Sequence, residues 1–186
     1  MQDISAIIKR IYNYFLFRKR NKYIERLKKN GLKLGANVEI IDNFFFDPSH
    51  CFLITIGDRC TICPNVRLIA HDASTKLRLG FTKIGKIEIL EDCFIGDSAV
   101  ILPNVRIGPN TIVGAGAVVT KNAPKNTIIA GNPARVICSI DEYLNKITRS
   151  AKGKKIYSAE YYIDLISEDQ KKEMLNSLNN EIGFIL

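Results

Sequence analysis

The stretch from Ile89 to Ala123 reads ILEDCFIGDSAVILPNVRIGPNTIVGAGAVVTKNA, and an aliphatic residue recurs in it at every sixth position. The residues at this position are Ile89, Ile95, Ile101, Ile107, Val113 and Val119. Four residues after each of them stands a small or β-branched side chain, and Gly, Asn, Asp and Pro fill the intervals. A period of six fits neither an α-helix nor a strand of simple alternation. The stretch therefore predicts a repeat architecture.

Each hexapeptide can form one short strand and one turn. The aliphatic side chain points inward, and Gly or Asn takes the tight corner, where a positive φ costs little. One unit cannot bury its own apolar face, so the units must stack in coils around a continuous aliphatic core. The same register occurs earlier at Ile56 and Ile62, and more loosely from Leu34 and Ile40. We therefore predict an all-β core, a parallel β-helix, over residues 34–138.

The charge of the chain is concentrated at its beginning. Residues 1–33 carry ten Lys and Arg against two acidic residues, whereas residues 34–138 carry ten against nine. A nearly neutral central domain argues against binding of nucleic acid. Apolar residues at helical spacing predict a basic amphipathic helix over residues 4–29. This helix either packs on the β-helix or lies on an anionic membrane surface.

Residues 139–186 are expected to form a helical extension. Capping-box patterns begin at Ser139 and Ser167, each with Glu or Gln three residues later. These helices pack either on the β-helix or on a neighbouring chain. The chain contains no apolar run long enough to span a membrane and no secretory signal pattern, so a cytoplasmic location is expected.

The chain has five cysteines, an odd number, and free thiols are expected. Cys60 and Cys63 have the spacing of a metal or redox pair, but no second pair follows. The repeat explains Cys60 better, as a small interior side chain. No metal is therefore expected.

The tandem hexapeptides resemble those of the left-handed parallel β-helix acyltransferases. The segment VVTKNAPKNTIIAGNPARVI, residues 118–137, is similar to the C-terminal signature of the maltose/galactoside O-acetyltransferase branch. The chain also resembles bacterial polysaccharide O-acetyltransferases. The resemblance covers about residues 34–138 and implies acetyl-CoA as the cosubstrate and a homotrimer as the assembly. It also implies the left-handed coil, since the general rule for parallel strands favours the opposite hand.

The hexapeptide pattern breaks at Leu68, where the sequence reads LIAHDA and Asp72 replaces the expected small residue. The next aliphatic residue in register is Ile89, so residues 71–84 are predicted to form an extended loop. In the family that the chain resembles, a histidine at the start of such a loop is the general base, which implies this role for His71. Imidazole suits removal of a hydroxyl proton near neutral pH. Asp72 or a backbone carbonyl is expected to hold the other ring nitrogen.

The second histidine of the chain, His50, lies at another irregular point, where the interval from Phe46 to Ile56 is longer than the repeat allows. It either shapes the acceptor pocket or has a structural or surface role, and the latter is the preferred interpretation. The resemblance further implies acceptor contacts at Asn43 and Asp42.

The resemblance also places acetyl-CoA along the coils. The positions that match family contacts are Asp97, Gly114, Ala115, Thr120, Lys121 and Arg135. Simple corner packing also explains Gly114 and Ala115. Lys121 and Arg135 are better discriminators, because an ammonium and a guanidinium can meet the phosphates or the pantetheine end of the cosubstrate.

Together these features predict an acetyl-CoA-dependent O-acetyltransferase that acts on a sugar hydroxyl in bacterial surface-polysaccharide assembly. The acceptor would be a sugar, a sugar nucleotide or a lipid-linked sugar, the last with peripheral membrane contact. The alternatives are N-acetylation of an amino sugar nucleotide and a non-enzymatic scaffold. A β-helix carbonic anhydrase would need three histidines on zinc, and the chain has two.

Overall fold

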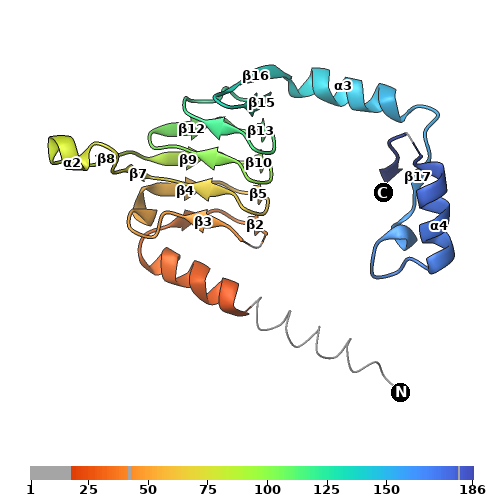
Figure 1. Cartoon of the computed structure of the whole chain (residues 1–186), viewed down its shortest axis with the longest axis horizontal. Helices are drawn as coiled ribbons and strands as arrows, with labels where there is room; N and C mark the ends of the chain where they lie inside the picture. The colour runs from red at the N-terminus through yellow and green to blue at the C-terminus, as the bar shows by residue number, and fades with distance from the viewer. Residues whose placement is uncertain (1–17, 42, 180) are drawn as a thin grey trace. The chain divides into compact units, whose positions relative to one another are not determined.

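The computed structural model describes residues 18–41, 43–179 and 181–186. The chain divides into two compact units, of which the first ends at Ile140 and the second runs from Asp141 to Leu186. Short parallel strands stacked on one another make up most of the first unit (Figure 1). The parallel β-helix predicted from the hexapeptides is confirmed.

Three sheets of parallel strands enclose the core of the first unit. Sheet A contains β1 (Lys33–Leu34), β4 (Ile54–Ile56), β9 (Ile87–Ile89) and β12 (Val105–Ile107). Sheet B contains β2 (Glu39–Ile40), β5 (Thr61–Ile62), β10 (Phe94–Ile95), β13 (Ile112–Val113) and β15 (Thr127–Gly131), to which β16 (Ala134–Ser139) adds in the antiparallel direction. Sheet C contains β3 (Phe45–Phe46), β6 (Arg67–Leu68), β11 (Val100–Ile101) and β14 (Val118–Val119).

The chain visits sheets A, B and C in turn, so three hexapeptides complete one coil. Ile95 accordingly pairs with Val113, and Ile101 pairs with Val119, in each case the aliphatic residue of the third hexapeptide that follows. From Ile56 to Val119, the aliphatic residues of the repeat are at most 1% exposed. Burial of one such side chain contributes about 1.5–3 kcal/mol, so this ladder is the main source of stability. We call the turns from sheet B to sheet C the B–C edge, and those from sheet C to sheet A the C–A edge.

Asn and Gly have different tasks at the corners. Asn104 and Asn110, each three residues after an aliphatic residue of the repeat, adopt positive φ angles of 62° and 51°. Gly96 has no positive φ, but a Cβ there would lie 2.6 Å from the backbone nitrogen of Ala115 in the next coil. The sequence led us to expect a positive φ at the corner glycines. Gly96 does not have one, and its role is to let neighbouring coils stack closely. Gly116, with a φ of 67°, does match that expectation.

Two insertions interrupt the stack, and both leave it at the C–A edge. Phe46 pairs with Leu68, and Leu68 pairs with Ile101, and both of these intervals along the chain are longer than three hexapeptides. The first insertion, residues 47–53, ends in a 3-10 helix, η1 (Cys51–Leu53). The second insertion, residues 69–86, contains β7 (His71–Asp72), α2 (Lys76–Leu79) and β8 (Lys83–Ile84), and α2 projects away from the strands (Figure 1). The extended loop predicted over residues 71–84 falls within this insertion.

The described part of the N-terminal helix, residues 18–29, covers the first coil. Leu27 is 1% exposed and belongs to the core, and Tyr23 and Ile24 pack against it. The apolar side chains of this part therefore cap the β-helix. Residues 4–17 of the predicted helix lie outside the described residues.

The second unit begins within α3 (Ile140–Ala151), which starts directly after Ser139 as the sequence predicts. It also holds η2 (Ala159–Tyr161), α4 (Glu168–Ser177) and a two-stranded parallel sheet of β17 (Ile156–Tyr157) and β18 (Phe184–Ile185). The predicted capping box at α4 is present, since Ser167 Oγ accepts from Gln170 N at 3.3 Å and Gln170 Oε1 accepts from Ser167 N at 2.8 Å. Within the described residues, no helix has the length and apolarity to cross a membrane.

The cysteines of the repeat lie inside the coils. Cys60 is fully buried and Cys93 is 2% exposed, and all five cysteines of the chain carry free thiols. The expected role of Cys60 as a small interior side chain is confirmed.

Candidate active site

The two insertions bring a carboxylate and an imidazole together at the C–A edge. Asp47 follows β3 and has a fully buried side chain, whereas the side chain of His71, in β7, is 34% exposed. Asp47 Oδ2 and His71 Nδ1 are in direct contact. The two residues meet although they are far apart in sequence, because Phe46 and Leu68 pair in neighbouring coils.

The Asp47 carboxylate is also held by the backbone of both insertions. Its Oδ1 accepts a hydrogen bond from Ser49 N at 3.1 Å, and its Oδ2 accepts one from Ala70 N at 3.2 Å. A buried carboxylate needs such partners to offset the loss of water. The carboxylate is therefore fixed before any substrate binds.

The contact with Asp47 determines which His71 nitrogen is free to act. An ionised carboxylate only accepts hydrogen bonds, so Nδ1 carries the proton of this contact. Nε2 then holds the unshared electron pair and can accept a proton. Since the His71 side chain is part exposed while Asp47 is buried, the ring is reachable from outside and the carboxylate supports it from within.

His50 stands beside this pair. Its Nδ1 lies 3.8 Å from Asp47 Oδ2, and its ring centroid lies 5.0 Å from that of His71. The sequence favoured a structural or surface role for His50. The structure instead places it with the two residues of the candidate site.

Among the described residues, one group of side chains is close enough together to hold a metal ion. It consists of Asp47, His50 and His71, whose ligand atoms all lie within 4.8 Å of one another. A bound ion needs its ligands at about 2 Å. Because Asp47 Oδ2 and His71 Nδ1 touch each other directly, they would have to separate to admit one. The observed arrangement is that of a hydrogen-bonded pair.

The expected orienting role of Asp72 does not match its contacts. Asp72 Oδ1 accepts from Ser74 N at 3.0 Å, and Asp72 Oδ2 lies 3.0 Å from the Lys83 ammonium. The hydrogen bond from Ser74 and, next, the Lys83 ammonium lower the pKa of Asp72 to about 2. The carboxylate that contacts His71 is Asp47, which sequence reasoning missed. Asp72 instead ties β7 to β8 at the root of the second insertion.

The residues expected to bind acetyl-CoA or the acceptor divide between two edges. Thr120 and Lys121 follow β14 and are exposed at the C–A edge, the edge of His71. The B–C edge carries Asn43, Asp97, Gly114 and Ala115. Arg135 lies on β16. Within one chain the structure therefore does not gather all of these residues at His71.

Two residues of the B–C edge have local structural explanations as well. Asn43 has a φ of 62°, the left-handed conformation that Asn adopts at the other corners. Asp97 accepts hydrogen bonds from Asn65 in the coil below, at 3.2 Å, and from Ser98, at 2.9 Å. Asp42 lies outside the described residues.

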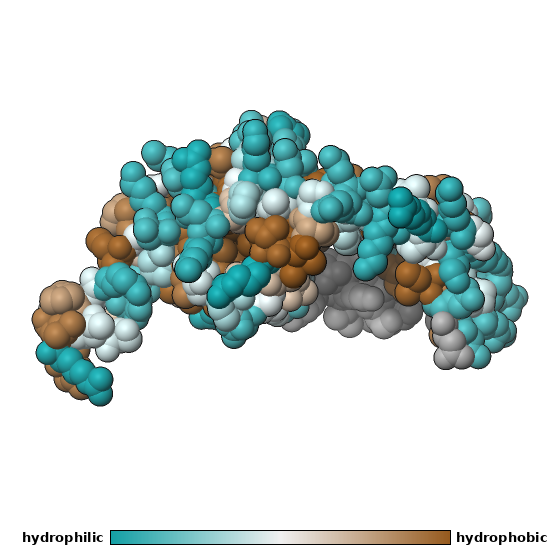
Figure 2. All heavy atoms as spheres, turned by 90° about the horizontal axis from the view of Figure 1, so that it is seen from above, coloured by the Kyte–Doolittle hydropathy of each residue, from teal (hydrophilic) through white to brown (hydrophobic). Residues whose placement is uncertain are grey.

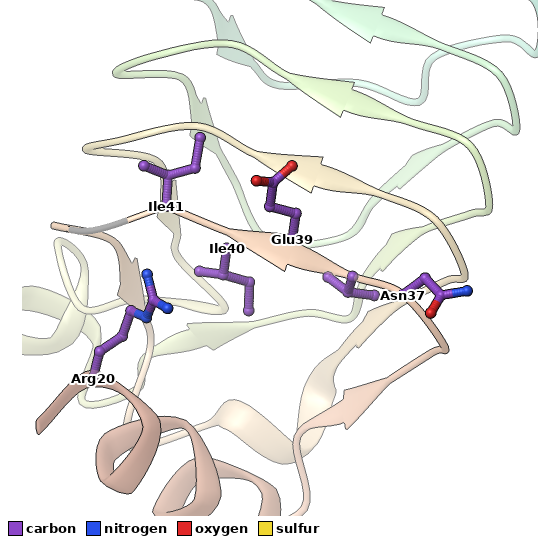
Figure 3. Close-up of a pocket in the computed structure, with 6 residues that line it drawn as sticks. Arg20, Asn37, Glu39, Ile40 and Ile41 are labelled. Carbon is purple, nitrogen blue, oxygen red and sulfur yellow. The ribbon is translucent and has the colours of Figure 1, made fainter. Parts of the chain in front are cut away.

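A separate hollow opens between the N-terminal helix and the first coil (Figure 3). Arg20 of the helix and residues 37–41 around β2 line it, and the Arg20 side chain extends toward Ile41. Its lining includes none of Asp47, His50 and His71, so we do not assign it to the candidate site.

Comparison with known proteins identifies the family of the chain. The bacterial transferase hexapeptide pattern of six repeats matches residues 86–121. Galactoside O-acetyltransferase of Escherichia coli K12 is 38% identical over 115 residues, which cover 58% of this chain and 57% of that protein. Protein CapG of Staphylococcus aureus is 38% identical over 139 residues, which cover 72% of this chain and 80% of CapG.

A solved structure shows the same fold. A hexapeptide-repeat acetyltransferase of Vibrio cholerae, determined with acetyl-CoA, matches 59% of this chain and 60% of its own with a TM-score of 0.53 and 30% identity. The chain thus spans little more than half the length of this enzyme and of the galactoside enzyme, 60% and 57%. Such relatives imply that the coil is left-handed. On the extent of the CapG match and on the repeat itself, the chain belongs to the hexapeptide-repeat acetyltransferase family.

Proposed function

We propose that this protein transfers an acetyl group from acetyl-CoA to a hydroxyl group of a sugar, with His71 as the general base. The observation that carries the proposal is the contact of His71 Nδ1 with the buried carboxylate of Asp47. It leaves Nε2 of a part-exposed ring free to accept a proton. Acetyl transfer from a thioester to a hydroxyl requires a base of this kind.

The proposed reaction has two proton transfers. The acceptor oxygen attacks the thioester carbonyl while His71 Nε2 removes the hydroxyl proton, which forms the tetrahedral intermediate. As the C–S bond breaks, the imidazolium returns this proton to the leaving sulfur, so that the products are the acetyl ester and CoA thiol. Asp47 stays ionised throughout and stabilises the imidazolium, as the third group of an acyl-transfer triad does.

The sugar acceptor is supported by the relatives. A galactoside O-acetyltransferase shares 38% identity with this chain, and the solved acetyltransferase binds acetyl-CoA. We extend this to bacterial surface-polysaccharide assembly on the resemblance described above. The acetyl-CoA contacts proposed for Thr120 and Lys121 are supported by their exposure at the same edge as His71.

We also propose that the active assembly is a homotrimer with each site between two chains. A neighbouring chain that brings its B–C edge to the C–A edge of the first would join Asp97, Gly114 and Ala115 to His71. The projecting second insertion suits such a contact, because Leu77 is 97% exposed and Phe81 is 63% exposed. Brown spheres mark apolar side chains at its tip (Figure 2). Light scattering should give the trimer mass, whereas a monomer fully active at high dilution would contradict the proposal.

The function is tested by thiol release from acetyl-CoA across a panel of sugars, sugar nucleotides and amino sugar nucleotides. We expect acceptor-dependent thiol release with a galactoside or another neutral sugar, and an ester in the product by mass spectrometry. An alkali-stable amide on an amino sugar nucleotide would replace the O-transfer proposal by N-transfer. Release that persists unchanged in His71→Ala would contradict the role of His71.

A further inference from the structure

The environment of His50 suggests that the site contains a second functional imidazole. His50 ends the turn after Asp47 and immediately precedes η1. Its ring centroid lies 5.0 Å from that of His71 and 6.0 Å from that of Phe52. The first insertion therefore contributes an imidazole to the site as well as a carboxylate.

The Nδ1 atom of His50 is not accounted for by the fold. Within the described residues this nitrogen is buried and lacks a hydrogen-bond partner. A buried polar atom without a partner reduces stability. Such atoms in a folded protein call for an explanation, and one beside a candidate base points to function.

The Asp47 carboxylate is the charged group with which His50 Nδ1 can interact. Asp47 Oδ2 lies 3.8 Å from His50 Nδ1 and also touches His71 Nδ1. Ser49 N and Ala70 N hold the same carboxylate through its two oxygens. Next to His71 in the chain, Asp72 pairs with Lys83 at 3.0 Å. Both imidazoles thus lie beside one carboxylate oxygen, His71 in direct contact with it and His50 3.8 Å away.

We propose that His50 is a positioning residue of the acetyl-transfer site that acts through Asp47. Its Nδ1 lies 3.8 Å from Asp47 Oδ2, the oxygen that His71 Nδ1 contacts. Without His50 only Ser49 N, Ala70 N and His71 hold the carboxylate, so its contact with His71 is less firmly set and the proton on His71 is no longer confined to Nδ1. The proposal rests on the proposed function in one respect, namely that His71 is the base.

The test uses nitrogen NMR of the full chain labelled in histidine. The chain has two histidines, so each single variant assigns the ring signals of the other. At a pH where the His71 ring is neutral, wild-type His71 should give separate signals for a protonated Nδ1 and an unprotonated Nε2. His50→Phe should move both signals toward the average of the two tautomers. His50→Asn, which keeps an N–H donor near the position of Nδ1, should restore most of the wild-type pattern.

Turnover supplies the second measurement. His50→Phe should lower kcat about tenfold without a change in KM for acetyl-CoA, and its acid-side pH profile should shift with the His71 signals. His50→Asn should recover most of this loss. Identical His71 signals and kcat in wild type and His50→Phe would overturn the proposal, and so would His50→Asn if it behaved as His50→Phe does.

A reciprocal variant covers the case in which His50→Phe does not fold. In His71→Phe, Asp47 Oδ2 loses one partner, so the His50 signals should move toward a protonated Nδ1. Unchanged His50 signals would then overturn the proposal. If the NMR results are as expected but no acceptor releases thiol from acetyl-CoA, the shared carboxylate stands and the proposed function fails.

Discussion

The C–A edge of this β-helix contains both regular turns and insertions, and the difference separates structure from chemistry. In the third coil, Leu102, Pro103 and Asn104 connect Ile101 to Val105, and Asn104 takes the left-handed conformation. The same edge in the first two coils needs residues 47–53 and 69–86. The regular turn closes the coil with three residues. The insertions add side chains that a hexapeptide cannot supply and bring them together at one edge.

Buried polar side chains show the same contrast. Asp47 and Thr111 are both fully buried. Thr111 Oγ1 donates to the carbonyl oxygen of Pro124 at 2.8 Å, so its hydroxyl joins two regular coils. Asp47 is held by backbone N–H groups but faces two histidines. A buried hydroxyl in the repeat thus supports the fold, and a buried carboxylate beside the repeat supports a reactive ring.

The largest effect on turnover should come from His71→Ala. Loss of a general base lowers turnover by about 10² to 10⁴-fold. The fold should persist, because His71 lies in the second insertion and outside the aliphatic ladder. Thiol release from acetyl-CoA measures the loss, and circular dichroism checks the fold. In the wild type, turnover should fall on the acid side of the pH profile as the imidazole takes up a proton. Near wild-type turnover in folded His71→Ala would exclude His71 as the base.

Asp47→Asn should have the next largest effect. Loss of a group that orients a reactive imidazole costs about 10 to 100-fold. An amide in place of the carboxylate also removes the charge that stabilises the imidazolium. Turnover with saturating acetyl-CoA measures this loss.

Asp72→Asn is the matched control for Asp47→Asn. Asp72 pairs with Lys83 and not with His71, so turnover should stay within about twofold. The pKa of Asp72 is lowered to about 2, so its contact with Lys83 is present at neutral pH and is lost only as the pH falls through that value. The acid limb of the rate profile near neutrality is therefore not due to Asp72. A larger loss for Asp72→Asn than for Asp47→Asn would support the role first expected for Asp72.

The sequence was sufficient for the part of the fold that repeats. Each aliphatic residue of the hexapeptides faces the core, because a six-residue period leaves one inward position per strand. The loop after Leu68 was predicted for the same reason, since a break in a strict period is itself a signal. The repeat does not assign individual partners across coils, and Asp47 was missed for that reason.

A signal for Asp47 was nevertheless present in the sequence. The interval from Phe46 to Ile56 is longer than the repeat allows, and three strands after Phe46 the second break begins at Leu68. Two breaks at the same position of successive coils must lie side by side on one edge. Counting coils would therefore have placed Asp47 and His50 near His71. The contact between Asp72 and Lys83 was harder to foresee, because it depends on how the second insertion folds back on itself.

Ile101→Ala tests the contribution of the regular coils, as opposed to the insertions. Ile101 is fully buried and pairs with Leu68 below and Val119 above. Removal of a core isoleucine costs about 2–5 kcal/mol of unfolding free energy. Turnover per folded molecule should stay close to that of the wild type, since the insertions keep their register. Urea unfolding followed by circular dichroism measures the first effect and thiol release the second. A loss of turnover at temperatures where the variant is fully folded would mean that the ladder and the site are coupled.

The smallest effect on turnover should come from the basic surface of the N-terminal helix. Lys19, Lys22 and Lys29 are exposed, whereas Leu27 of the same helix caps the core. Deletion of the helix would uncover that core, so replacement of these three lysines by Gln is the sharper test of membrane contact. Each basic residue near an anionic surface contributes about 1 kcal/mol, and copies in a trimer add to one another.

We expect the wild type to co-sediment with anionic vesicles at low salt and to be released by salt, and the triple Gln variant to bind far less. A matched control replaces Lys146, Lys152 and Lys172 of the C-terminal segment, which removes the same charge elsewhere. Turnover on a soluble acceptor should be unchanged in both triple variants, because neither set includes a residue proposed for the site. If the wild type ignores anionic vesicles, or if both triple variants lose binding equally, the helix is not a membrane contact. Selective loss in the first triple variant would direct the search for the acceptor toward lipid-linked sugars, since a surface-bound enzyme meets those first.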